Sequence, residues 1–142
     1  MTATSPGLVE LVDICHSMQQ RNIELFARLG AIVTNGEAGS SGRLFAEACH
    51  RHAWHADLWA ARRPVIPVEP TPVTPTPVAA GDEDDHDGDV VGAYRAEIDV
   101  IRELLRELTG RVNRDLDPST VRVIELVSAD LTSIDDRLAC QP

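Results

Sequence analysis

Residues 94–112 read YRAEIDVIRELLRELTGRV, and the apolar side chains of this segment recur at alternating steps of four and three residues. This spacing places them on one face of an α-helix, while the charged residues between them face water. Segments 8–33 and 118–139 repeat the pattern, and segment 42–62 follows it less regularly. The pattern therefore predicts four amphipathic helices. Their predicted inward-facing residues are Leu11, Cys15, Met18, Asn22, Leu25, Leu29 and Ile32; Phe45, Cys49, His52, Ala56 and Trp59; Tyr94, Ile98, Ile101, Leu105, Leu108 and Val112; and Thr120, Ile124, Val127, Leu131, Ile134 and Leu138.

Local signals define the ends of the predicted helices. Gly36 follows the first helix and can adopt the left-handed conformation in which many helices end. Ser40 or Ser41 can cap the start of the second helix, because a side-chain oxygen at this position accepts a hydrogen bond from a free backbone N–H. Asp89 and Asp117 can cap the third and fourth helices in the same way.

Proline and acidic residues fill the connection between the second and third helices, residues 63–89. Six prolines lie in residues 64–78, and six carboxylates follow in residues 82–89. Proline favours the extended polyproline II conformation over helix, and the carboxylates repel one another. At about 3.1 Å per residue, the proline-rich part alone reaches on the order of 45 Å, whereas a 20-residue helix is about 30 Å long. The linker can therefore return the chain to either end of a helical hairpin.

These features predict an all-α fold, a four-helix bundle formed by a single domain over residues 1–142. Residues 8–62 form one helical hairpin and residues 90–140 form the other. The proline-rich and acidic linker then serves as a long crossover between the second and third helices. An up-down order of the helices is the alternative, because the linker is long enough for both.

Charge and composition exclude several functions. The chain carries 13 basic and 23 acidic residues, for a net charge of −10, and every basic residue is arginine. Without lysine, the chain cannot form a Schiff base or the Gly-Lys-Ser/Thr phosphate-binding loop. The negative charge argues against nucleic acid and anionic membranes as partners. No segment approaches the roughly 18 apolar residues of a membrane span.

The three cysteines, Cys15, Cys49 and Cys140, include no CxxC pair. An odd number without such a pair argues against a disulfide framework and favours a reducing compartment. The first residues reach Glu10 and Asp13 before any long apolar run, unlike a secretory signal. We therefore expect a cytoplasmic protein.

Residues 44–59, LFAEACHRHAWHADLW, resemble the second helix of bacterial ferritin-like bundles. The order of two helices, a long crossover and two more helices is also similar to that superfamily. The resemblance implies a site for two iron or manganese ions. In such sites two helices each contribute a Glu, and the other two each contribute a Glu-x-x-His motif.

The residues of this chain match that metal pattern incompletely. Glu47 and His50 form a Glu-x-x-His motif, but at about 100° per residue both lie opposite the predicted inward face. Glu24 also lies opposite the inward face of its helix, and Ser128 stands where the second motif would have histidine. A dinuclear site needs several inward carboxylates to balance the metal charge. The sequence therefore predicts a degenerate relative without a complete dinuclear site.

The histidines of residues 50–55 are the strongest functional signal. His52 and His55 are three residues apart and share a helical face, and in a hairpin Asn22 lies at the level of His52. We favour a buried His52–Asn22 hydrogen bond, which satisfies both polar groups and requires no metal or cofactor. The alternative is a site for iron or another transition metal, since imidazole suits these ions. Its candidate ligands are His52, His55, His16, Glu47 and His50.

Two functions follow from these patterns. The first is an interaction or scaffold module that binds a protein partner or a second copy of itself. It is favoured because Leu44, Trp54 and Leu58 add a second apolar side to helix 42–62, and because no catalytic constellation is recognisable. The second is a metal- or cofactor-dependent oxidoreductase that uses the helix-two histidines. We assign no catalytic residue from the sequence.

Overall fold

The structure, a computed structural model, describes residues 4–67, 72 and 89–141. These residues contain α-helices and one short 3₁₀ turn but no strand, so the predicted all-α four-helix fold is confirmed. Residues 68–71 and 73–88, on which the predictions about the linker fall, lie outside the described residues. The helices are α1 (Leu8–Thr34), α2 (Gly42–Arg62), α3 (Val90–Arg111) and α4 (Pro118–Ala139), and the 3₁₀ turn is η1 (Gly39–Ser41).

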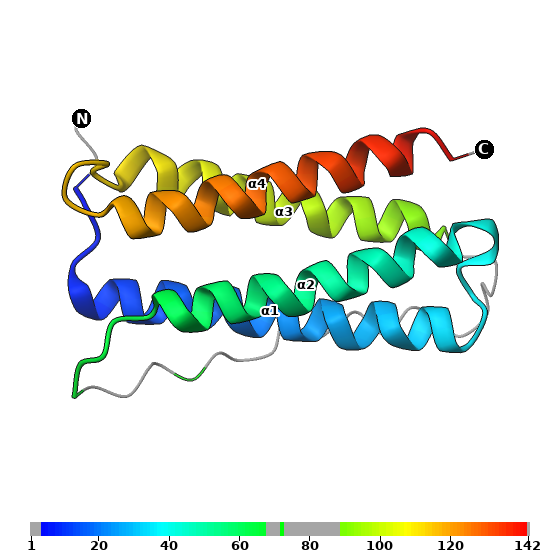
Figure 1. Ribbon diagram of the computed structural model, residues 1–142, viewed down its shortest axis with the longest axis horizontal. Coiled ribbons are helices and arrows are strands. Elements are labelled where there is room, and N and C mark those ends of the chain that lie inside the picture. Colours follow the sequence, from blue (N-terminus) through cyan, green and yellow to red (C-terminus); the bar gives the residue numbers. More distant parts are fainter. Residues whose placement is uncertain (1–3, 68–71, 73–88, 142) are drawn as a thin grey trace.

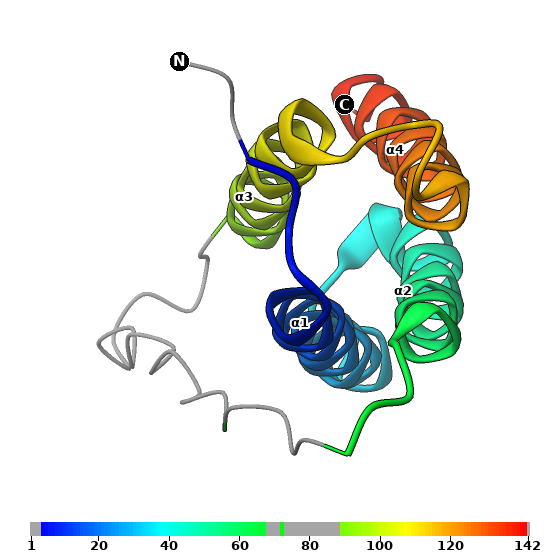
Figure 2. The same cartoon turned by 90° about the vertical axis from the view of Figure 1, so that its left-hand side faces the viewer.

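Around the bundle the helices follow the order α1, α2, α4, α3 (Figures 1 and 2). Helix α3 is therefore also a neighbour of α1, at a greater distance than the other neighbouring pairs. Hydrogen bonds fix the directions. Arg62, at the end of α2, bonds Asp117 before α4, and Ser41, before α2, bonds Gln141 after α4. Helix α2 therefore runs antiparallel to α4 and parallel to α3. The chain consequently leaves α2 at one end of the bundle and enters α3 at the other (Figure 1).

The apolar faces predicted from the spacing line the core. All the predicted positions of α3 and α4 are buried except Val112, which is partly buried. The predicted face of α1 is likewise buried except for Ile32, and that of α2 except for Cys49. Each buried Leu or Ile stabilises the fold by about 1.5–3 kcal/mol relative to an exposed one. Of the two tryptophans, Trp59 is fully buried and Trp54 is partly exposed.

Most of the predicted helix ends are confirmed. Helix α1 ends with Asn35 as its C-cap, and Gly36 follows with φ +72°, in the left-handed region that favours glycine. Asp89 and Asp117 accept hydrogen bonds from backbone N–H groups of the first turns of α3 and α4. The predicted serine at the start of α2 is confirmed, but its side chain does not cap the helix. Ser41 is the N-cap, but it belongs to the 3₁₀ turn (φ −88°, ψ 3°) and its hydroxyl donates to Gln141 instead.

Helices α1 and α3 are farther apart than the other neighbours. No Cα of α1 lies within 8 Å of a Cα of α3, whereas α1–α2, α2–α4 and α3–α4 all approach that closely. Long side chains bridge the gap at two levels. Arg111 donates to Glu10 at 2.6 Å, and farther along the bundle Glu97 pairs with Arg28 at 3.5 Å.

Candidate functional site

A chain of hydrogen bonds crosses the core and joins three helices through His52. The imidazole is fully buried, with Nδ1 2.8 Å from Asn22 Oδ1 on α1 and Nε2 2.6 Å from the Tyr94 hydroxyl on α3. The predicted pairing of His52 with Asn22 is confirmed. Asn22 in turn donates from Nδ2 to the carbonyl of Met18 at 2.8 Å. The buried side chains of Asn22, His52 and Tyr94 are therefore bonded to one another or to the backbone.

The hydrogen bonds define one tautomer of His52. Because the amide nitrogen of Asn22 donates to Met18, its oxygen faces the ring and accepts from Nδ1. The neutral ring then carries a lone pair on Nε2, which accepts from the Tyr94 hydroxyl. Burial lowers the pKa of His52 to about 3, and the neighbouring His55 acts in the same direction. Burial also raises the pKa of Tyr94. Both groups are thus neutral at physiological pH.

His55 forms a second polar contact, toward α4. It is fully buried, and its Nε2 donates to Asp130 Oδ2 at 2.9 Å, while Arg51 approaches the same oxygen at 3.7 Å. Burial lowers the pKa of His55 although Asp130 opposes the effect. Nδ1 of His55 and Nε1 of Trp59 have no hydrogen-bond partner among the described residues. A neutral His55 leaves Nδ1 as a lone pair.

The other predicted ligands lie apart from these two histidines. His16 faces Arg63, whose Nη1 lies 3.5 Å from Nδ1 of His16. Glu47 is exposed and pairs with Arg137, and His50 is also exposed, so the predicted outward orientation of this motif is confirmed. Within the part of the chain that the structure describes, no three His, Cys, Asp or Glu side chains form a group able to hold a metal ion. The five candidate ligands are not brought together.

The buried thiols are not activated. Burial raises the pKa of Cys15 to about 11 and raises that of the partly buried Cys49 above its usual value. Cys49 instead donates a hydrogen bond to the carbonyl of Phe26 at 3.2 Å. Since the thiolate is the nucleophile, neither side chain is suited to covalent catalysis at neutral pH.

Two partners in this network were not predicted. The sequence pattern placed Tyr94 on the inward face of its helix without a contact to the histidines, and it assigned no role to Asp130. A signal existed for Tyr94, because a tyrosine among inward positions needs a partner for its hydroxyl. Asp130 had no such signal, since its contact depends on how α4 is rotated against α2.

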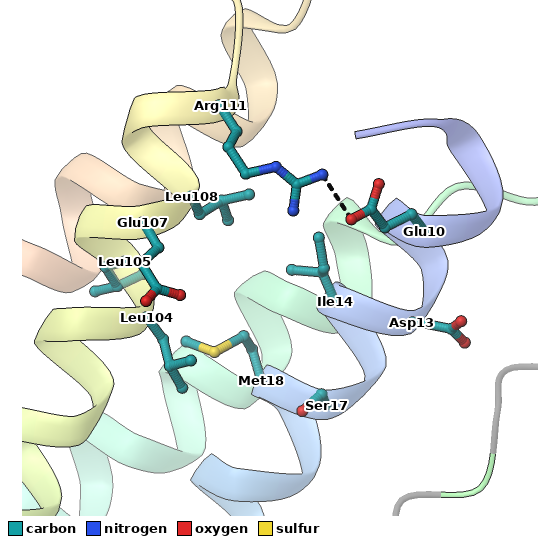
Figure 3. Close-up of a pocket in the computed structure, with 10 residues that line it drawn as sticks. All are labelled: Glu10, Asp13, Ile14, Ser17, Met18, Leu104, Leu105, Glu107, Leu108 and Arg111. Atoms are coloured by element: carbon teal, nitrogen blue, oxygen red, sulfur yellow. Dashed lines mark hydrogen bonds and ion pairs between the residues drawn. The ribbon is translucent and has the colours of Figure 1, made fainter. Parts of the chain in front are cut away.

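A groove between α1 and α3 is the second candidate site, and the sequence did not indicate it. Figure 3 shows Ile14 and Met18 of α1 pointing toward Leu104 and Leu108 of α3. The space between these helices has a volume of about 320 Å³. We call it the α1–α3 groove. Its lining residues are Glu10, Asp13, Ile14, Ser17, Met18, Leu104, Leu105, Glu107, Leu108 and Arg111.

Comparison of the chain with family models, curated proteins and solved structures gives no significant match. Among the described residues, no helix combines the length and the apolar character needed to cross a membrane.

Proposed function

We propose that this chain is a helical interaction module, a ferritin-like bundle without a complete dinuclear metal site that binds a protein partner through the α1–α3 groove. The resemblance of residues 44–59 to ferritin-like bundles supports the assignment to that class of fold. The three free cysteines support a reducing, cytoplasmic location.

The groove is the observation on which this proposal rests. Four-helix bundles normally close each pair of neighbouring helices, yet α1 and α3 remain apart while the other three pairs approach closely. The space between them is lined by apolar side chains such as Ile14 and Leu104, which are only partly buried. Apolar surface that stays open to water gains free energy when a partner covers it.

The polar groups of the core do not offer a comparable site. Both ring nitrogens of His52 are already bonded within the chain, and Nε2 of His55 is bonded to Asp130. A metal ion at His52 would have to displace Asn22 or Tyr94 from a fully buried position. This geometry supports the interaction module over the oxidoreductase.

Chelation tests the oxidoreductase alternative. A metal ion bound only by the native state stabilises it by mass action, so its removal lowers the melting temperature. We expect EDTA to leave the melting temperature of protein purified without a histidine tag unchanged, and equally so for His52→Ala. A decrease that occurs in the wild type and is absent in His52→Ala would favour the oxidoreductase.

An uncharged amphipathic peptide tests the groove as a docking site. A 15-residue helical peptide with leucine on one face and glutamine on the other should bind the full chain. Its NMR titration should shift the signals of Ile14, Ser17 and Leu104 most. Shifts centred on another face, or no shifts at millimolar peptide, would contradict the proposed docking site.

A further inference from the structure

The α1–α3 groove is long enough to accept one row of apolar side chains from about three turns of a partner helix. Ion pairs cross from α1 to α3 at Glu10 and again at Arg21 and Arg28, which pair with Glu97. From residue 10 to residue 21, α1 rises about 16 Å. Apolar side chains at positions i, i+4, i+7 and i+11 of a helix cover the same distance. A helix lying on the groove can therefore insert one such row between the two ion-paired ends.

The rim of the groove is acidic. The lining residues include the carboxylates of Glu10, Asp13 and Glu107 but a single cation, Arg111. That cation already donates to Glu10 at 2.6 Å. Glu107 is exposed on α3, and Figure 3 shows its carboxylate beside the gap between the two helices. Between the ion pairs at its two ends, the groove thus presents an apolar floor whose lining carries more carboxylates than cations.

Charge selects among the possible occupants. A second copy of this chain would bring its own net charge of −10 to an acidic rim, so like charges would oppose self-association there. An anionic helix would meet the same repulsion. A cationic helix would place its basic residues opposite the rim carboxylates, and complementary charge both steers encounter and sets the orientation of binding.

We propose that the α1–α3 groove binds a cationic amphipathic helix of a protein partner, with its apolar row on Ile14, Met18 and Leu104 and its basic residues beside Glu107. This inference rests on the proposed function, because it names the class of partner for the same site.

Three peptides of identical apolar face test the inference against the full chain. Each has 15 residues, and the polar face carries arginine, glutamine or glutamate. Fluorescence anisotropy at about 0.15 M salt should rank the affinities in that order. The cationic peptide should bind about tenfold more tightly than the neutral one, the change produced by about 1.4 kcal/mol.

A charge reversal locates the effect. Glu107→Arg, at an exposed position of the rim, should weaken binding of the cationic peptide and strengthen binding of the anionic one. Asp136→Arg makes the same charge change at an exposed position on α4, the helix diagonal to α1 (Figure 2). It should leave the order of the peptides unchanged. Equal effects of the two variants would show diffuse attraction to an acidic protein and would overturn the inference.

Filling the groove provides the second measurement. In Ser17→Trp the indole occupies the space between the helices, and binding of all three peptides should be lost. Ala129→Trp, at an exposed position on α4, should bind them like the wild type. Circular dichroism checks that both variants fold. If Ser17→Trp does not fold, the charge reversal by Glu107→Arg remains a test of the inference.

The outcomes separate the two claims. If the neutral peptide binds as tightly as the cationic one and Ser17→Trp abolishes both, the groove is a docking site that does not select by charge. The proposed function then stands and the inference fails. If no peptide binds, or Ser17→Trp changes nothing, both fail. A dimer in solution that Ser17→Trp dissociates would also overturn the inference, because the occupant would be a second copy.

Discussion

The hydroxyl of Tyr94 is the donor to the Nε2 lone pair of His52, and both groups are shielded from water. Tyr94→Phe removes that donor and leaves a buried acceptor unsatisfied, at a cost of about 1–3 kcal/mol. We expect the free energy of unfolding in urea to decrease by this amount while the helical content is retained. Ser133→Ala, at an exposed position on α4, serves as the control, with a change within about 0.5 kcal/mol.

The Tyr94→Phe result is contradicted if its stability matches that of the wild type. A double-mutant cycle that combines Tyr94→Phe with His52→Leu measures the coupling free energy between the two side chains. When both partners are apolar, no unsatisfied group remains, so the loss for the double variant should be smaller than the sum of the single losses.

The two buried histidines predict a loss of stability in weak acid. In the unfolded chain histidine binds a proton below pH about 6.5. Burial lowers the native pKa of His52 to about 3 and lowers that of His55 as well. The unfolded state therefore binds more protons than the native state between these pH values. The stability is fully present above about pH 6.5 and decreases as the pH falls toward the native pKa.

Each histidine contributes a slope of up to about 1.4 kcal/mol per pH unit in this range. Urea unfolding between pH 6.5 and 5 measures the slope before most carboxylates of the unfolded chain become protonated. His52→Gln should have a lower free energy of unfolding at neutral pH, and that free energy should depend less steeply on pH than in the wild type. A slope that survives unchanged in this variant would show that His52 is not its source.

At the scale of the helices, the two capping aspartates differ in the hydrogen-bond donors that they bind. Among the hydrogen bonds of the described residues, the Asp89 side chain accepts only from the Gly92 N–H, at 2.8 Å. Asp117 accepts from the Thr120 N–H at 3.0 Å and also from Arg62 of α2 at 2.8 Å. Asp89→Ala should therefore cost about 1 kcal/mol, the usual effect of losing a cap, and Asp117→Ala more. Urea unfolding measures both, and equal losses would contradict the role of Arg62.

The sequence predicted the helices well because three of the four segments repeat their apolar positions without interruption and because Asp89, Asp117 and Gly36 are strong local signals. These signals act over one or two turns, as does the pattern itself. Ser41 starts α2 as predicted, but its side chain forms no capping bond because Ser41 belongs to a 3₁₀ turn, which sequence spacing does not reveal. Contacts between helices were predicted where two polar residues faced each other at one level, as for His52 and Asn22.

At the scale of the whole molecule, the groove could not have been predicted. The spacing of Met18 and Leu104 shows which way each side chain faces, but not how far apart α1 and α3 lie. That distance results from how α2 and α4 hold the other two helices. The five candidate metal ligands are not brought together for a related reason. His16 and His55 are near one another in a simple hairpin, yet His16 lies beside Arg63 instead.

The two helical hairpins should remain together when the linker is cut. Buried and partly buried hydrogen bonds join them across the bundle, including His52 to Tyr94, His55 to Asp130 and Arg62 to Thr120. A protease site introduced between residues 76 and 80 allows the cleavage. We expect the fragments to co-elute in gel filtration with the helical content of the intact chain. The melting temperature should become dependent on concentration, because folding is then an association. Separation of the fragments under native conditions would contradict this picture.

The directions of the helices also determine how the molecule responds to mechanical load. Ser5, before α1, bonds the carbonyl of Arg111 at the end of α3, whereas Gln141, after α4, bonds Ser41 at the opposite end of the bundle. The first and last helices thus begin and end at opposite poles (Figure 1). Tension applied through these two ends acts along the helix axes and loads the interhelical packing in shear. All the core layers between the helices then resist the force together. If both ends of the chain lay at the same end of the bundle, the force would separate the layers one after another.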